Sequence, residues 1–154
     1  MFKKFLLGLF FLFSFNVDAT HLLGGEIVWK CKPNGKYQFT LVLYRECAGI
    51  SLPTTAQSLA TNAGVSISCA FISTTDVVPS CYTGTTTCAG ATSGTGKMQK
   101  YVYRSGDITL TGTPPASGWY FTWTSCCRPS SITNVVSPGG ASYLLRAIMY
   151  PYTP

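Results

Sequence analysis

The fold is decided in residues 26–45, which read EIVWKCKPNGKYQFTLVLYR. Large apolar side chains recur at every second position in residues 26–32 and again in 37–44, which is the period of a half-buried β-strand. Between the two runs, Asn34 and Gly35 form a dipeptide that favours a tight hairpin turn. We therefore predict an antiparallel hairpin over residues 26–45.

The rest of the chain also reads as short strands separated by Gly and Pro, with no sustained helical period. The further predicted strands are residues 65–71, 101–104, 108–110, 119–123 and 143–150. Stretches 48–64 and 79–96 are rich in Ser, Thr, Gly and Ala and are predicted as loops. We expect an all-β chain in the form of an antiparallel immunoglobulin-like β-sandwich with disulfides, although a partly open barrel would leave the same pattern.

The N-terminus indicates export. Lys3 and Lys4 precede an apolar run over residues 5–15 that is too short to span a bilayer. Ala19 then completes a small-residue cleavage site, so residues 1–19 are interpreted as a signal peptide. We expect a secreted or cell-surface product, with residues 20–154 as a single β-sandwich module and no membrane association after cleavage.

Cysteine is abundant for a chain of 154 residues, and in an exported protein cysteines indicate disulfides first. The seven are Cys31, Cys47, Cys69, Cys81, Cys88, Cys126 and Cys127. An odd count leaves one thiol over when six are paired, and the connectivity stays open. The local candidate is Cys81 with Cys88, and the long-range candidate joins Cys47 to Cys126 or Cys127, because adjacent cysteines in an extended segment point in opposite directions.

The sequence has few of the acidic and histidine residues that a catalytic site would need. After cleavage of the predicted signal peptide, the acidic side chains and the one imidazole that remain are Glu26, Glu46, Asp76, Asp107 and His21. A hydrolase triad would have to use His21 at a flexible terminus, and copper chelation there would need a second histidine. We predict no catalytic residues, no metal site, no cofactor and no enzymatic activity.

Aromatic side chains are the remaining functional candidates, because flat rings stack on the apolar faces of sugars. The candidate ligand or partner surface is Trp29, Trp119, Tyr120 and Trp123, with Tyr101 and Tyr103 as further exposed aromatics. The competing interpretation is a sandwich interior, since Trp119, Phe121 and Trp123 share one face of a predicted strand. The formal net charge is +6, but the basic residues are scattered rather than clustered, so no nucleic-acid partner is expected.

Three stretches resemble a known family. They are ATHLLGGEIVWKC at residues 19–31, YQFTLVLYREC at 37–47 and SCCRPSSITNVVSPGGASY at 125–143. Together they are similar to the N-terminal module of large secreted proteins of Bacteroidota, which often end in a gliding-motility-associated C-terminal domain. The resemblance implies a surface or extracellular multidomain protein, exported through the type IX system, and no catalytic residues transfer from it. This chain departs from the pattern at its C-terminus, after AIMYPYTP at residues 147–154, where relatives continue into further β modules and a sorting domain.

The expected function is a non-catalytic extracellular structural or interaction module of a bacterial cell-surface assembly, serving adhesion, gliding motility, or a matrix or filament. Its expected partners are other protein modules or copies of itself, which could pair by strand addition at residues 143–150. The alternative is a glycan-binding β-sandwich module that takes surface glycans as ligands.

Overall fold

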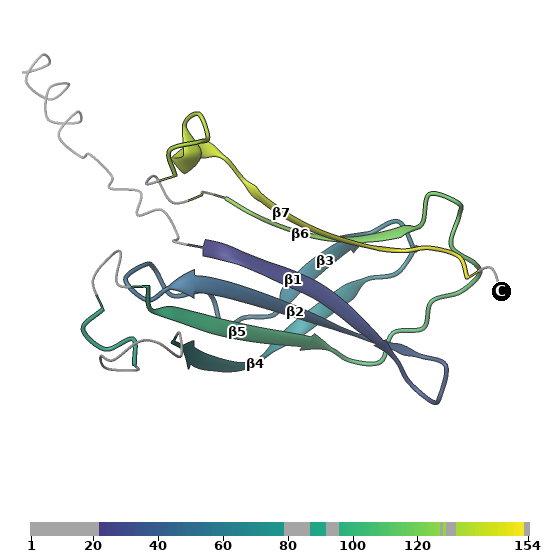
Figure 1. The fold of residues 1–154 in the computed structure, drawn as a ribbon. Helices are drawn as coiled ribbons and strands as arrows, with labels where there is room; N and C mark the ends of the chain where they lie inside the picture. The colour runs from purple at the N-terminus through teal and green to yellow at the C-terminus, as the bar shows by residue number, and fades with distance from the viewer. Residues whose placement is uncertain (1–21, 79–86, 92–95, 127, 129–131, 153–154) are drawn as a thin grey trace, which may run out of the picture.

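The chain folds into one seven-stranded antiparallel sheet, seen in a computed structural model that describes residues 22–78, 87–91, 96–126, 128 and 132–152 (Figure 1). The strands are β1 (Leu22–Cys31), β2 (Tyr37–Glu46), β3 (Gln57–Thr61), β4 (Ile67–Val77), β5 (Met98–Ser105), β6 (Trp119–Ser125) and β7 (Tyr143–Met149), and a short 3-10 helix, η2 (Pro138–Gly140), precedes β7. Their spatial order is β1-β2-β5-β4-β3-β6-β7. The predicted all-β antiparallel class is confirmed; the predicted signal peptide lies outside the described residues.

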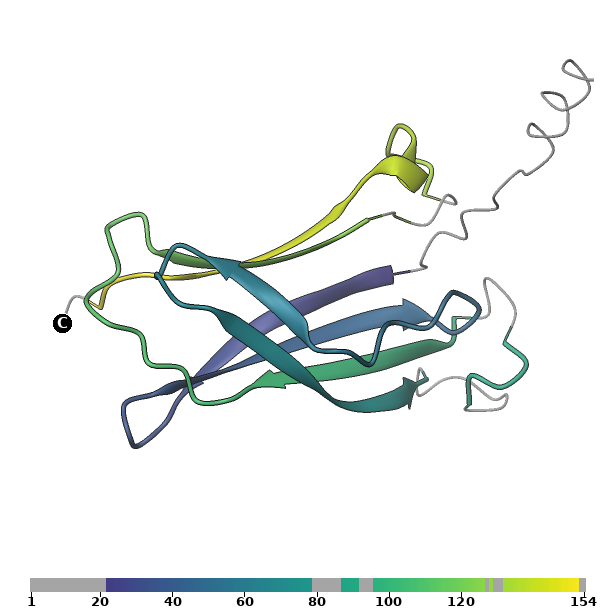
Figure 2. The ribbon, with the colours of Figure 1, turned by 180° about the vertical axis from the view of Figure 1, so that it is seen from behind.

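The sheet curls until it is nearly a barrel, because β3 belongs to two parts of it. Residues 57–59 of β3 pair with β4, whereas Ala60 and Thr61 pair with β6. The strands β6 and β7 therefore lie over the layer made by β1, β2, β5 and β4, and the view from behind shows β3 crossing between the two (Figure 2). The outermost strands β1 and β7 end up side by side, and successive antiparallel pairings make them run in the same direction.

The predicted hairpin is present as β1 and β2, which pair from Leu22 opposite Arg45 to Cys31 opposite Tyr37. Its turn differs from a two-residue Asn-Gly loop. The amide of Gly35 donates to the carbonyl of Lys32, and Gly35 has a φ of 73°. A turn over residues 32–35 that ends in a left-handed glycine makes a longer hairpin loop with a bulge, which suits the fixed φ of proline at residue 33.

Aromatic rings fill the centre of the core. Phe39 and Phe121 lie 4.5 Å apart between ring centroids, and Trp29 lies 5.9 Å from Phe121. Because these rings come from β1, β2 and β6, they join the two layers across the interior. Trp119 and Trp123 point to the same side of β6 as Phe121 and are buried with it. The interpretation of this row as core, rather than as an exposed ligand surface, is confirmed.

Two predicted elements are wrong. The stretch 48–64 was expected to be a loop, yet it contains β3, whose only buried large apolar residue is Leu59. A strand with a single apolar anchor has little periodicity to detect, and its pairing on both sides stabilises it instead. Residues 108–110 were expected to be a strand, but only Ile108 pairs, in an isolated bridge with Tyr37.

The disulfide pairing is also different from the predicted one. Cys47, just after β2, bonds to Cys88 in the segment between β4 and β5. Both proposed pairings, Cys81 with Cys88 and Cys47 with Cys126 or Cys127, are therefore wrong. Cys126 is disulfide-bonded as well, whereas Cys81 and Cys127 lie outside the described residues.

Two of the described cysteines carry free thiols, so the expectation of one spare cysteine is wrong. Cys31 is exposed at the end of β1, and Cys69 is buried on β4. Cys69 faces the core, where its strand neighbours are Gln57 and Ser105 rather than a second cysteine. Burial raises the pKa of the Cys69 thiol to about 11, so it behaves as a small apolar core residue.

Candidate functional site

The four aromatic residues predicted to form a ligand or partner surface do not lie together. Trp123 is buried, and its indole nitrogen donates to Gln57 Oε1 at 3.2 Å. Tyr120 points outward from β6, where the guanidinium carbon of Arg146 lies 5.2 Å from its ring centroid. Only Trp29 and Trp119 meet in one site. The further candidates Tyr101 and Tyr103 are buried in the core, so their expected exposure is wrong.

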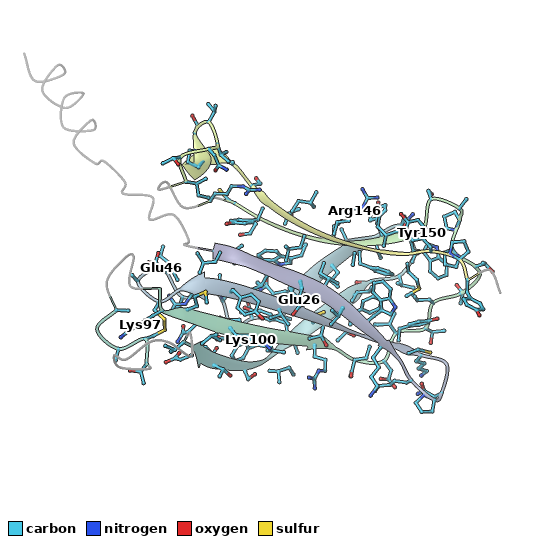
Figure 3. All side chains as sticks on the ribbon, in the orientation of Figure 1. Glu26, Glu46, Lys97, Lys100, Arg146 and Tyr150 are labelled. Carbon is cyan, nitrogen blue, oxygen red and sulfur yellow. A yellow bond between two sulfur atoms is a disulfide. The ribbon has the colours of Figure 1, made fainter. Side chains whose placement is uncertain are left out.

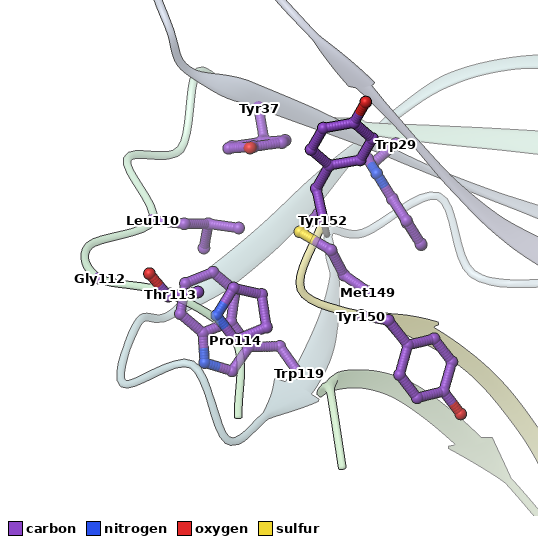
Figure 4. Close-up of a pocket in the computed structure, with 10 residues that line it drawn as sticks. All are labelled: Trp29, Tyr37, Leu110, Gly112, Thr113, Pro114, Trp119, Met149, Tyr150 and Tyr152. Carbon is purple, nitrogen blue, oxygen red and sulfur yellow. The ribbon is translucent and has the colours of Figure 1, made fainter. Parts of the chain in front are cut away.

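Trp29 and Trp119 line a pocket of about 400 Å³ at one end of the barrel (Figure 4). The end of β1, the start of β6 and the end of β7 meet here, on the side where the C-terminus lies (Figure 1). The remaining walls come from Tyr37, Leu110, Gly112, Thr113, Pro114, Met149, Tyr150 and Tyr152. Volumes between roughly 300 and 1,000 Å³ are usual for small-molecule sites. None of these ten side chains carries a charge, so the electrostatics of the pocket favour a neutral ligand.

The polar atoms of this pocket have no partner within the described part of the protein. They are the hydroxyls of Tyr37, Thr113, Tyr150 and Tyr152 and the indole N–H groups of Trp29 and Trp119. In the core, by contrast, the Tyr103 hydroxyl donates to the Pro53 carbonyl at 2.7 Å, and the Trp123 indole donates to Gln57. Trp119 is only 8% exposed, and a buried donor without a partner calls for a water or a ligand.

Both pocket tryptophans are held rigidly from behind. The ring of Trp29 packs on Phe39 at 6.5 Å and on Phe121 at 5.9 Å, which fixes one side of it against the core. Beside Trp119, the side chain of Asn62 binds both neighbouring backbone groups. Its Oδ1 accepts from the Tyr120 amide at 2.8 Å, and its Nδ2 donates to the Gly118 carbonyl at 3.3 Å. The two walls that these tryptophans form are therefore preorganised.

The connection from β5 to β6, which supplies one wall, is anchored at its start. Tyr37 and Ile108 exchange two backbone hydrogen bonds of 2.8 Å each. Next to them, the Asp107 carboxylate binds Lys32 Nζ and Asn34 Nδ2 at 2.5 and 3.2 Å. The hydrogen bonds from Lys32 and Asn34 lower the pKa of Asp107. This clamp holds the connection against the β1–β2 turn.

A second candidate surface is the seam between β1 and β7. A hollow of about 390 Å³ lies there among Ile27, Val28, Trp29 and Ala147. Gly25 closes the seam further along, since a Cβ at this position would come within 2.8 Å of Leu145 Cδ1. The outermost strands are each paired on one side only in the described sheet, so both carry a row of free backbone groups.

The opposite end of the barrel is internally satisfied. The guanidinium of Arg45, only 6% exposed, donates to Gln99 Oε1 through Nε at 2.9 Å and through Nη2 at 2.6 Å, and it also binds the Gly49 carbonyl. Gln99 in turn donates to Asp76 at 2.8 Å, and the other Asp76 oxygen accepts from the Cys88 amide at 2.9 Å. Figure 3 labels Glu46 and Lys97 at this end and Tyr150 at the other.

Sequence reasoning identified Trp29 and Trp119 but missed the rest of the pocket, because its walls are separated widely along the chain. The only sequence signals of these walls are the run from Thr111 to Pro115, which contains two hydroxyl side chains, and the repeated tyrosines near the C-terminus. Within the described residues, no cluster of three metal-ligating side chains occurs, and no helix has the length and apolar character needed to cross a membrane. No protein-family profile, curated protein or solved structure matches this chain.

Proposed function

We propose that this chain is a non-catalytic, extracellular interaction module with an immunoglobulin-like sandwich fold. The strand order supports the fold proposal. In constant-type immunoglobulin domains, strands A, B, E and D form one sheet and strands C, F and G the other. Lettered in chain order, the strands here give A-B-E-D and then C-F-G, joined through β3. The Cys47–Cys88 bond differs from the usual bridge between strands B and F.

The free edge of β7 is the observation that carries the interaction proposal. Exposed edges pair readily with other strands unless charges, bulges or prolines protect them. β1 carries Glu26 and Lys30 and has a register shift between Leu22 and Gly24. β7 has one charged residue, Arg146, and a side chain at Leu144 that is 60% exposed. A neighbouring strand therefore adds more readily to β7 than to β1.

The neighbour is another module or a second copy of the chain, within a cell-surface or extracellular assembly. The apolar hollow at Ile27, Val28, Trp29 and Ala147 lies beside β7 and offers burial for a side chain of the added strand. The predicted signal peptide and the Cys47–Cys88 disulfide support a location outside the cytoplasm. Roles in adhesion, gliding motility or matrix building rest on the family resemblance alone.

Light scattering after size-exclusion chromatography of residues 20–154 tests this proposal. We expect the average mass to rise with protein concentration. Leu144→Lys should hold the chain as a monomer, because it places a charge on the proposed pairing edge. The matched control is Ile72→Lys, since Ile72 is a comparably exposed apolar residue on β4, an inner strand. A monomer at every concentration would count against self-assembly.

A further inference from the structure

We infer that the pocket at the C-terminal end of the barrel is a binding site for a neutral saccharide. This inference does not depend on strand addition at β7, because the two sites use different atoms and different tests. It assigns the predicted glycan-binding function to a defined pocket.

The walls of the pocket have a shape and chemistry that suit a sugar ring. Trp29, Trp119 and Tyr152 contribute flat rings around the same space (Figure 4). One face of a pyranose ring presents only C–H groups, which pack against aromatic rings, whereas its edges carry hydroxyls. An uncharged aromatic pocket therefore suits a neutral sugar and disfavours an acidic one, since no cation lines it to pair with a carboxylate or sulfate.

The hydrogen-bonding groups of the pocket also suit a sugar. The hydroxyls of Tyr37, Thr113 and Tyr152, which have no partner among the described residues, each donate and accept, and the two indole N–H groups donate, whereas the Tyr150 hydroxyl points away from the other lining residues (Figure 4). A sugar carries many groups that also donate and accept, so it can satisfy these atoms together. A proline-rich peptide also binds aromatic grooves, but its prolines have no N–H and offer carbonyl acceptors alone. The density of dual-function hydroxyls favours the sugar.

Preorganisation of the two tryptophans lowers the entropic cost of binding. Trp29 is fixed by Phe39 and Phe121, and Trp119 is fixed through Asn62 and its strand neighbours. Tyr152, by contrast, is 88% exposed. The two rigid tryptophans thus form a platform, and Tyr152 is a side chain that a bound sugar would cover.

Titration of residues 20–154 with neutral hexasaccharides of glucose, mannose and N-acetylglucosamine tests the inference, followed by tryptophan fluorescence and by calorimetry. We expect saturable binding of at least one of them, with a fluorescence change from Trp29 and Trp119. Tyr152→Ala and Trp119→Phe should each weaken binding about fivefold or more, through lost stacking and a lost donor respectively. The exposed position of Tyr152 makes its substitution compatible with folding.

Tyr120→Ala is the matched control, because Tyr120 lies on β6 next to Trp119 but points to the outer face. It should change the affinity less than twofold. Absence of binding to every neutral hexasaccharide at millimolar concentration would overturn the inference, and so would unchanged affinity in both pocket variants. Binding of a proline decamer in place of the sugars would overturn it in favour of a peptide ligand, and selective binding of hexagalacturonate would overturn the argument from charge.

Discussion

The two ends of the barrel differ in how their polar groups are satisfied. At the Cys47–Cys88 end, Arg45, Gln99 and Asp76 form a continuous chain of hydrogen bonds that ends on the Cys88 amide. At the pocket end, the hydroxyl and indole groups of the lining have no internal partner among the described residues. Buried polar atoms are costly to leave unpaired, so the network at the first end stabilises the fold. The polar groups of the pocket are left for solvent or for a ligand.

Removal of the disulfide at the stabilised end is the strongest test of this difference between the two ends. The double substitution Cys47→Ala and Cys88→Ala removes a cross-link between residues separated by 41 positions. We expect a loss of about 4 kcal/mol in the free energy of unfolding, measured by urea denaturation, because the unfolded chain gains the entropy of an open loop. Cys31→Ser is the control, since that exposed thiol is free, and should change stability by less than about 0.5 kcal/mol. A loss no larger than the control's would contradict the assignment.

The next largest effect is expected at Arg45. Arg45→Met keeps most of the apolar stem but removes the guanidinium, which leaves the Gly49 carbonyl without that donor and Gln99 Oε1 with the Tyr101 hydroxyl alone. The expected loss is about 3 kcal/mol by chemical denaturation, because buried acceptors would lose charge-assisted hydrogen bonds. Arg104→Met, on the neighbouring strand β5, removes an exposed guanidinium and should be close to neutral. Equal effects of the two substitutions would show that the network adds no stability.

A pair of glycines tests the pocket end. Gly112 and Gly118 both have left-handed backbones, with φ of 86° and 81°. A Cβ at Gly112 meets open space, whereas one at Gly118 would meet the Ile148 side chain and lie 3.1 Å from the Met149 carbonyl. We expect Gly112→Ala to cost about 1 kcal/mol from backbone strain and Gly118→Ala about 2 kcal/mol from strain and crowding. Thermal denaturation of both variants gives the difference, and a smaller loss at Gly118 would contradict the packing of β6 on β7.

The smallest effects are expected at low pH, because each end of the barrel contains one hydrogen-bonded carboxylate. Hydrogen bonds from Gln99 and Cys88 lower the pKa of Asp76, and those from Lys32 and Asn34 lower that of Asp107. Because both values are lower in the folded state, their stabilisation is complete above the unfolded-state pKa near 3.8 and is lost as the pH falls below it. Asp76→Asn and Asp107→Asn should each flatten the decline of the unfolding free energy between pH 4 and pH 2. An unchanged slope in both would contradict the two anchors.

Local patterns were enough to predict the β1–β2 hairpin, because alternation and a Pro-Asn-Gly turn are encoded within a few residues. β3 was missed because Leu59 is its only large buried residue and because one of its two partners, β6, lies far along the chain. The pairing of Cys47 with Cys88 depends on the curl of the sheet, which no local spacing reports. The pocket is even harder to predict from the sequence, because Trp29 and Tyr152 meet only when β1 and β7 lie side by side.

The parallel course of β1 and β7 has a mechanical consequence. The chain enters the barrel at one end and leaves it at the other, as both ribbon views show (Figures 1 and 2). Tension between neighbours attached at these points would run along the strands and load the β1–β2 and β6–β7 ladders in shear. Ladder hydrogen bonds lie perpendicular to the strands, so they would have to rupture together rather than one after another. In the proposed surface assembly, this geometry would resist pulling between the two ends of the barrel.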